Sequence, residues 1–315
     1  MDKIVFLDPV FCERIWGGRN LEKFDFSIPQ GNIGEAWVIA AHDNGSSKIT
    51  NGELAGLTLK EAYEKQPTLF TEKKYDKFPL LIKILDASDN LSVQVHPEDD
   101  YARENENGEL GKTECWYVLD AKEGAKLVYG HTAKTKEEFT DKINREQWQE
   151  LFIEEEVKAG DFFYIPAGTL HAIGEGILIY EVQQNSDTTY RVYDYDRVDK
   201  DGNKRELHIE KTKDVTKVPF EKVTTSPKTE KLEGATVTYL ADERYFSVFK
   251  VEVEGQVSLE KTRTGNLFTV LNGSGSVEID GNIYDVKKGD SFILTTDCSK
   301  YTLKGNMFLV GSYDR

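Results

Sequence analysis

Four polar residues in strand-like segments carry side chains that bind metal ions: Gln94, His96, Glu114 and His171. Gln94 and His96 are two positions apart, so on a β-strand both side chains point to one face while the apolar neighbours point to the other. One amide, two imidazoles and one carboxylate suit zinc, and three or four protein ligands leave room for water or a substrate. The sequence therefore predicts one metal site.

The segment before His171 indicates how that imidazole is positioned. From Gly160 the chain reads G-x5-P-x-G-x2-H, with Pro166 and Gly168 ahead of the histidine. Proline and glycine favour a tight turn between two strands, and this turn delivers the imidazole onto the second strand. The motif resembles the second motif of the cupin β-barrels, with one departure: Glu175 stands where that family often has asparagine. An isolated histidine on an apolar strand is more often a core or surface residue, and the other three candidates favour a ligand here.

Several longer segments resemble one enzyme family. They read ERIWGG, FPLLIKILDASDNLSVQVHPEDDYA, GKTECWYVL and PAGTLHAIGEGILIYEVQQNSDTTYRVYD. In this order they resemble the type I mannose-6-phosphate isomerases in their short bacterial form, and separated motifs in one order are a specific signal. The resemblance implies an enzyme that interconverts mannose 6-phosphate and fructose 6-phosphate through a cis-enediol(ate), with one Zn²⁺ per chain as Lewis acid.

The resemblance also implies roles for six further residues, three catalytic and three substrate-binding: Arg191, Lys112 and Glu181, and then Lys83, Asp187 and Trp16. The planar guanidinium of Arg191 suits either the enediolate or the phosphate. Lys112 is two residues before Glu114, so on a strand it shares the face of that ligand. Glu181 and Asp187 are candidate proton carriers, and Lys83 is a candidate phosphate contact.

Some of these residues also have structural interpretations. Lys83 and Glu181 alternate with apolar residues, as half-exposed strand residues do. Asp187 suits a turn, and Trp16 suits packing at least as well as a sugar pocket.

Composition restricts the class of partner. The formal net charge of −16 disfavours nucleic acids and anionic membranes. An anionic substrate must therefore meet a local cluster of basic residues. The resemblance implies a small-molecule sugar phosphate as partner, and we expect a monomer or homodimer as assembly.

The cysteines and the first residues indicate the compartment. Cys12, Cys115 and Cys298 form no close-spaced pair and are expected to be free thiols in a reducing environment. The N-terminus lacks the apolar stretch of a signal peptide, and no window has the length of a membrane span. The sequence predicts a cytoplasmic protein.

An internal repeat predicts two similar β units. WYVLDAKEGAKLVYG parallels FTVLNGSGSVEIDG, and GDFFYIPAGTLHAI parallels GDSFILTTDCSKYTL. The expected fold is mainly β, with two cupin-type barrels of the jelly-roll kind: a catalytic metal-binding domain at 1–232 and a degenerate domain at 233–315. In the second copy Lys300 stands opposite His171, and an ammonium has no lone pair for a metal. Asn266 stands opposite Glu114, so the second barrel is expected to be structural.

A few short helices are expected in and before the first barrel. Thr58 with Glu61, and Thr135 with Glu138, have capping-box spacing. The first helix should end at Pro67. Two helices are expected within the insertion 131–159, the second including Trp148, Leu151 and Phe152, and 207–232 is expected to connect the barrels.

Two other functions fit part of the pattern. One is another metal-dependent cupin enzyme, such as a phosphoglucose isomerase or an oxygenase, although Gln94 is atypical of the histidine-rich iron sites of oxygenases. The other is a sugar-binding cupin without turnover. The presence of all four candidate ligands together with Arg191 and Lys112 disfavours it.

Overall fold

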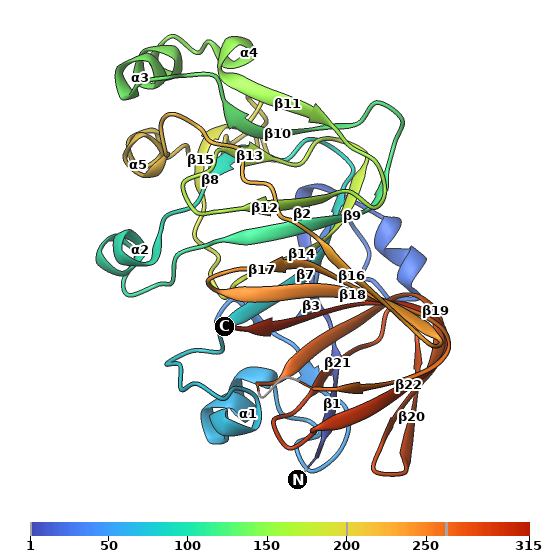
Figure 1. Cartoon of the computed structure of the whole chain (residues 1–315). Coiled ribbons are helices and arrows are strands. Elements are labelled where there is room, and N and C mark those ends of the chain that lie inside the picture. The colour runs from blue at the N-terminus through green and yellow to red at the C-terminus, as the bar shows by residue number, and fades with distance from the viewer. Residues whose placement is uncertain (1, 200, 262–263) are drawn as a thin grey trace.

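Antiparallel β-sheets dominate the computed structural model, which describes residues 2–199, 201–261 and 264–315 (Figure 1). The mainly β fold predicted from the sequence is confirmed. The three cysteines are free thiols, and none of the helices in the described ranges has both the length and the apolar character needed to cross a membrane.

Two sheets form most of the first domain. The six-stranded sheet has the order β12 (Phe162–Ile165), β9 (Glu114–Ala121), β14 (Ile177–Gln184), β7 (Leu80–Ala87), β3 (Ile33–Ile39) and β2 (Val10–Gly18). The five-stranded sheet has the order β11 (Phe152–Glu156), β10 (Lys126–His131), β13 (His171–Ala172), β8 (Val93–Val95) and β15 (Tyr190–Tyr193). Apolar side chains from both, such as Leu85, Val118 and Leu127, pack into one cluster, so the sheets face each other across a shared interior.

A third sheet forms the second domain. Its order is β16 (Lys228–Leu232), β17 (Ala235–Asp242), β18 (Phe246–Glu260), β22 (Lys300–Asp314), β19 (Asn266–Ile279), β21 (Ser291–Leu294), β1 (Ile4–Asp8) and β6 (Lys48–Ile49), with β20 (Asn282–Lys287) beside β19. A small pair, β4 (Ala41–His42) and β5 (Gly45–Ser46), lies apart from it.

The helices are short: α1 (Leu59–Lys65), α2 (Asp99–Asn105), α3 (Lys136–Asn144), α4 (Trp148–Leu151) and α5 (Ile209–Val215), with 3-10 turns η1 (Asn20–Phe24) and η2 (Pro67–Leu69). The predicted caps are present, since the Thr58 hydroxyl accepts from the Glu61 amide and the Thr135 hydroxyl accepts from the Glu138 amide. Figure 1 shows α3 and α4 at the opposite end of the molecule from α1. Helix α5 lies in the expected connector and packs against β15.

The insertion differs from expectation in one element. Helix α4 ends at Leu151, and Phe152 begins strand β11, which pairs with β10. The prediction that Phe152 belongs to the second helix is therefore wrong. The following residues alternate between half-buried and exposed positions, and the free edge of β10 provides backbone partners that a helix in this place would leave unpaired.

Sheet pairing crosses the predicted boundary between residues 232 and 233. Strand β1 pairs with β21 of the second domain, and β16 pairs with β17. A single apolar cluster also contains Leu80 and Val182 of the first domain with Leu267 and Ile293 of the second. The division at 232 stays a prediction, and the two domains share a core.

The repeat has a structural counterpart in strand register. Glu114 of β9 pairs with Ile165 of β12, and Asn266 of β19 pairs with Leu294 of β21. His171 begins β13 and Lys300 begins β22. Glu114 and Asn266 thus occupy matched positions in their sheets, whereas His171 and Lys300 share only a place at the start of a strand.

We expect Lys300→Ala to leave kcat and KM for the substrate that the resemblance implies within about twofold of the wild type, because exposed substitutions away from special features have small effects. Lys300 is exposed, and Asn266 replaces the carboxylate of the first copy. Steady-state kinetics checks this, with the unfolding temperature as control for folding. A large fall in kcat at unchanged stability would mean that the second domain takes part in catalysis.

Candidate metal centre and substrate cavity

His96, Glu114 and His171 come together in the interior of the first domain. Their ligand atoms all lie within 4.8 Å of one another. The Nε2 atoms of His96 and His171 are each 3.3 Å from a different oxygen of Glu114. His96 follows β8 and His171 begins β13 in one sheet, whereas Glu114 begins β9 in the other, so the cluster bridges the two sheets.

Backbone carbonyls orient both imidazoles. His96 Nδ1 is 2.8 Å from the Thr188 carbonyl oxygen, and His171 Nδ1 is 2.9 Å from that of Thr169. A carbonyl can only accept, so each Nδ1 carries the proton and each Nε2 keeps a lone pair. Burial, followed by the charge of Lys112, lowers the pKa of His96 to about 3, and burial lowers the pKa of His171. Both rings are neutral near pH 7, as metal ligands must be.

The turn before His171 also supports His96. The Gly168 N–H donates to the His96 carbonyl at 2.8 Å, and Gly168 has a φ of +86°, which favours glycine. The tight turn predicted from Pro166 and Gly168 is present, with Thr169 N–H donating to the Pro166 carbonyl at 3.1 Å.

The buried polar atoms of this cluster fit a metal ion. Glu114 Oε1 and His171 Nε2 have no hydrogen-bond partner in the described parts of the chain, although unpaired buried polar atoms are costly. Burial would raise the pKa of Glu114, but Lys112 and then the two histidines hold it well below its usual range. One carboxylate and two imidazole lone pairs directed into a dry interior are a donor set that suits zinc.

Gln94 lies beside His171 in the five-stranded sheet. On β8 it pairs with His171 of β13 on one side and with Arg191 of β15 on the other. Directly opposed residues of antiparallel strands point to the same face. Gln94 therefore faces the cluster side of the sheet between His171 and Arg191, and its role as the fourth ligand stays a prediction.

A cavity of about 550 Å³ extends from this row. Gln94 is part of its lining. The lining also includes all six residues that the resemblance assigned to catalysis or substrate binding, which are Trp16, Lys83, Lys112, Glu181, Asp187 and Arg191. It also includes residues that sequence reasoning missed, above all Arg14, Glu35, Ser92, Trp116, Arg205 and His208.

Lys112 lies against the metal-binding cluster. Its Nζ is 3.0 Å from Glu114 Oε2 and 3.1 Å from His96 Nε2. Burial would lower its pKa, but Glu114 and then Glu181 outweigh burial and raise it. Lys112 is therefore a cation and a hydrogen-bond donor near neutral pH.

Glu181, Lys83 and Glu35 form a buried row of alternating charge on β14, β7 and β3. Lys83 Nζ is 3.8 Å from one carboxylate oxygen of each glutamate. Burial, followed by the charge of Glu114, raises the pKa of Glu181 to about 7. Its Oε1 accepts from Trp116 Nε1 at 2.9 Å. Glu181 is thus a carboxyl group able to change protonation state near neutral pH.

Glu35 is the main charged residue that sequence reasoning missed. It accepts from Arg14 Nε at 2.9 Å and from Trp37 Nε1 at 2.6 Å. Burial would raise its pKa, but Lys83 and then Arg14 outweigh burial and lower it to about 2. A signal was available, because Glu35 is the one charged residue in the apolar run 33–40.

Replacing Glu35 by glutamine should destabilise the protein by about 1–3 kcal/mol at pH 7, because buried Lys83 and half-buried Arg14 each lose a carboxylate partner while Lys83 keeps Glu181. The folded pKa lies below that of an exposed glutamate, so the carboxylate stabilises the fold above about pH 4.3. This contribution is lost as the pH falls toward about 2. Urea unfolding between pH 7 and 3 measures both effects.

The matched control is Glu22→Gln, which breaks an exposed pair with Arg19. Such pairs contribute about 0–1 kcal/mol. Equal losses in the two variants, or a Glu35→Gln protein as stable as the wild type, would contradict the interpretation of Glu35 as the buried counter-charge.

Arg191, Asp187 and Trp16 occupy different parts of the cavity wall. Arg191 Nε donates to Ser92 Oγ at 3.1 Å. Asp187 Oδ2 accepts from Asn44 Nδ2 at 3.1 Å. Trp16 both packs in the apolar core and lines the cavity, so its two interpretations are compatible.

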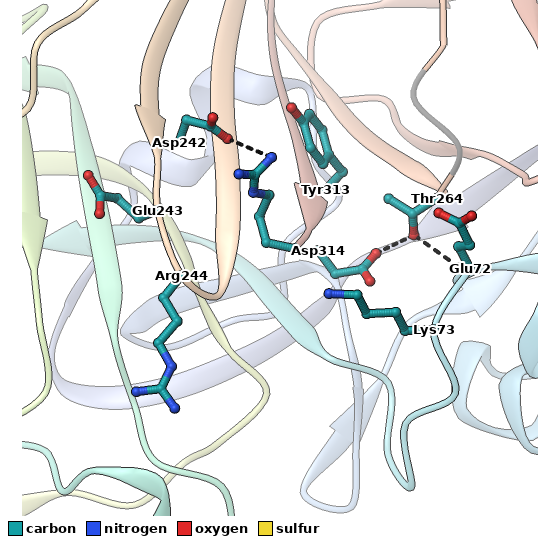
Figure 2. A pocket seen from close by; sticks show the side chains of 9 residues that line it. Glu72, Lys73, Asp242, Glu243, Arg244, Thr264, Tyr313 and Asp314 are labelled. Atoms are coloured by element: carbon teal, nitrogen blue, oxygen red, sulfur yellow. Dashed lines mark hydrogen bonds and ion pairs between the residues drawn. The ribbon is translucent and has the colours of Figure 1, made fainter.

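A second hollow, of about 670 Å³, lies where the two domains meet. Figure 2 shows the side chains around it, including the charged Asp242 and Asp314 and the neutral Thr264. Asp242 is 3.3 Å from Arg315 Nη1, and the Thr264 hydroxyl donates to Asp314. Among the residues that the structure describes, the lining of this hollow includes no histidine or cysteine, so it offers no comparable centre.

Two family models match the chain. Residues 4–119 match the catalytic domain of type I phosphomannose isomerase, and residues 235–314 match the cupin domain of mannose-6-phosphate isomerase. The mannose-6-phosphate isomerase ManA of Bacillus subtilis is 48% identical over 96% of this chain and 96% of its own length. The chain belongs to the mannose-6-phosphate isomerase family.

Other members of the mannose-6-phosphate isomerase family agree in sequence and fold. The mannose-6-phosphate isomerase of Streptococcus mutans is 46% identical over 99% of both chains. The crystal structure of the Bacillus subtilis mannose 6-phosphate isomerase matches with a TM-score of 0.96 at 44% identity, covering 99% of this chain and 100% of that one. A zinc-bound mannose 6-phosphate isomerase shares the fold, with a TM-score of 0.79 at 17% identity. The predicted cupin architecture is thereby confirmed.

Proposed function

We propose that this chain is a zinc-dependent isomerase that interconverts mannose 6-phosphate and fructose 6-phosphate. The observation that carries the proposal is the buried cluster of His96, Glu114 and His171 at the edge of a cavity lined by cationic and carboxylate side chains. Family membership supports the reaction, and the donor set supports the metal. Gln94 is proposed as the fourth ligand, with one zinc ion per chain.

Zinc at these ligands would supply a Lewis acid for the carbonyl of the open-chain sugar. One carboxylate among three neutral ligands leaves the centre with a net positive charge of about +1. Arg191 adds a fixed guanidinium on the same strand row, where it can donate to an oxygen that becomes negative as the enediolate forms. Lys112, held as a cation, donates from the other sheet.

Glu181 is proposed to move the proton between the first two carbons of the sugar. A group that both removes and returns a proton works best with a pKa near the working pH, and burial raises the pKa of Glu181 to about 7. Lys83 and Trp116 hold the carboxylate in place. Asp187 and Trp16 are proposed to contact the sugar.

A coupled assay tests the reaction directly. Mannose 6-phosphate is supplied, and fructose 6-phosphate is followed through its conversion to glucose 6-phosphate and the reduction of NADP⁺. We expect turnover that a chelator abolishes and zinc restores. Absence of turnover by the zinc-loaded protein would exclude the proposed activity and would favour a sugar-binding role. A cytoplasmic location and a monomeric or dimeric assembly stay predictions.

A further inference from the structure

The cations that line the cavity differ in how completely the protein neutralises them. Lys112 lies against Glu114, and Lys83 lies between Glu35 and Glu181. Lys83 in particular has carboxylate oxygens on two sides, which leaves it little reason to bind a substrate anion.

In the cavity wall near β15, cationic side chains outnumber the buried carboxylates that pair with them. Arg205 lines the cavity and pairs with the buried Asp194, but Arg197 pairs with the same carboxylate. Arg191 lines the cavity beside them, and burial, followed by the positive charge of Arg205, lowers its pKa. Another lining carboxylate here, Asp199, accepts from two backbone N–H groups of its own turn at 2.9 Å each. Three guanidinium groups therefore gather around one buried carboxylate.

Arg205 is fixed by the protein and keeps donor capacity. Its Nε donates to Asp194 Oδ2 at 2.8 Å, and its Nη2 donates to Asp194 Oδ1. No protein partner of its Nη1 is recorded within the described residues. Arg205 lines the cavity, and two of its three guanidinium nitrogens are bonded to Asp194. The group is therefore oriented in advance and keeps a nitrogen that can donate to an oxyanion.

Arg205 lies in the part of the cavity wall that also contains Arg191. His171, Gln94 and Arg191 lie in register on three neighbouring strands, and neighbouring strands are about 4.8 Å apart. Asp194, which holds Arg205, follows β15 directly. The row from His171 to Arg191 therefore leads from the metal-binding cluster to the strand that Asp194 follows, and a single cavity is lined by both Gln94 and Arg205.

We propose that Arg205 is the phosphate-binding residue of this cavity and that it recognises the phosphate monoester dianion of the sugar. The inference rests on the proposed function and deepens it. Arg191 is left to the reacting end of the sugar, and the phosphate contact that the resemblance gave to Lys83 moves to Arg205. We expect Arg205 to hold the phosphate equally in the ground state and the transition state, so that its loss raises KM and leaves kcat nearly unchanged.

The test compares Arg205→Gln with Arg197→Gln. Both variants remove one of the two guanidinium groups on Asp194, but only Arg205 lines the cavity. Arg197 also donates to the Asn90 carbonyl, so its loss should affect stability and leave phosphate binding intact. KM and kcat for mannose 6-phosphate and the inhibition constant of inorganic phosphate are measured for both variants and the wild type, each with its zinc content.

For Arg205→Gln we expect KM and the inhibition constant of phosphate to rise by about 10- to 100-fold, the range for a lost hydrogen bond to a charged group. The kcat should stay within about threefold. Unchanged KM and inhibition, a fall confined to kcat, or the same rise in Arg197→Gln would each overturn the assignment. A wild-type enzyme without turnover would instead overturn the proposed function.

Arg205→Lys provides a second variant in case Arg205→Gln does not fold. Lysine keeps a positive charge for Asp194 but loses the planar group that bonds to Asp194 and reaches the cavity together. Its KM and phosphate inhibition constant should therefore rise as well. Wild-type values in a folded Arg205→Lys protein would overturn the assignment.

Discussion

His171→Ala should yield a folded protein that contains little zinc and has lost more than about 100-fold of its activity. Loss of a partner beyond the ligands typically costs about 10- to 100-fold in metal affinity or activity, and loss of a ligand should exceed this. The change also leaves Glu114 Oε1 without its 3.3 Å neighbour. Metal analysis of the purified protein should give about one zinc per chain for the wild type and far less for the variant.

His131→Ala is the matched control. His131 is a buried histidine of the same domain whose Nε2 donates to the Lys217 carbonyl at 3.0 Å, and it does not belong to the metal-binding cluster. Its removal should lower the unfolding temperature and leave the zinc content normal. Two zinc ions per wild-type chain, or full zinc content in His171→Ala, would contradict the proposed centre.

Arg191→Ala should lower kcat by about 100-fold or more, the usual effect of removing a donor that stabilises charge in the transition state. Arg191→Lys should lower it as well. The guanidinium bonds to Ser92 Oγ and to the Glu206 carbonyl through Nε and Nη1, and a single ammonium group cannot make these bonds and also reach the cavity from a fixed position.

Measurements at saturating substrate, with zinc content checked, separate the possible roles of Arg191. The expected pattern is a low kcat with normal metal content, opposite to the KM effect expected for Arg205→Gln. A rise in KM alone would assign Arg191 to phosphate binding. If neither constant changes, the active site lies elsewhere.

Local signals in the sequence predicted much of this architecture. The capping box of Thr58 and Glu61 and the cap that Thr135 gives to Glu138 form because each depends on residues three positions apart. The turn before His171 forms because proline and glycine restrict the backbone there. The internal repeat predicted that Glu114 and Asn266 occupy corresponding positions, and their strand pairings correspond. In each case the information lies within a short segment or in a comparison of two segments.

The features that escaped prediction depend on which strands become neighbours. Glu35 reaches Lys83 because β3 lies beside β7, and Lys83 reaches Glu181 because β7 lies beside β14. No spacing along the chain reports that order. The proposed role of Arg205 depends on its pairing with Asp194 and on its place in the cavity wall. The sequence around Arg205 is polar, as in an exposed loop, and indicates neither. Ion pairs between neighbouring strands depend on the order of the strands in the sheet, so they can be identified only from the three-dimensional structure.

The pairing of β1 with β21 affects how this protein folds during its synthesis on the ribosome. Ile4 emerges among the first residues of the chain, and its partner Leu294 among the last. Contacts so distant in sequence form late and slow the folding of a chain. Until the second domain has been made, the apolar residues Val5 and Leu7 lack the strand against which they are buried. During synthesis the edge of β1 that later pairs with β21 is therefore unpaired, and unpaired strand edges promote association with other chains. A chaperone that covers this edge of β1 would increase the yield of folded enzyme.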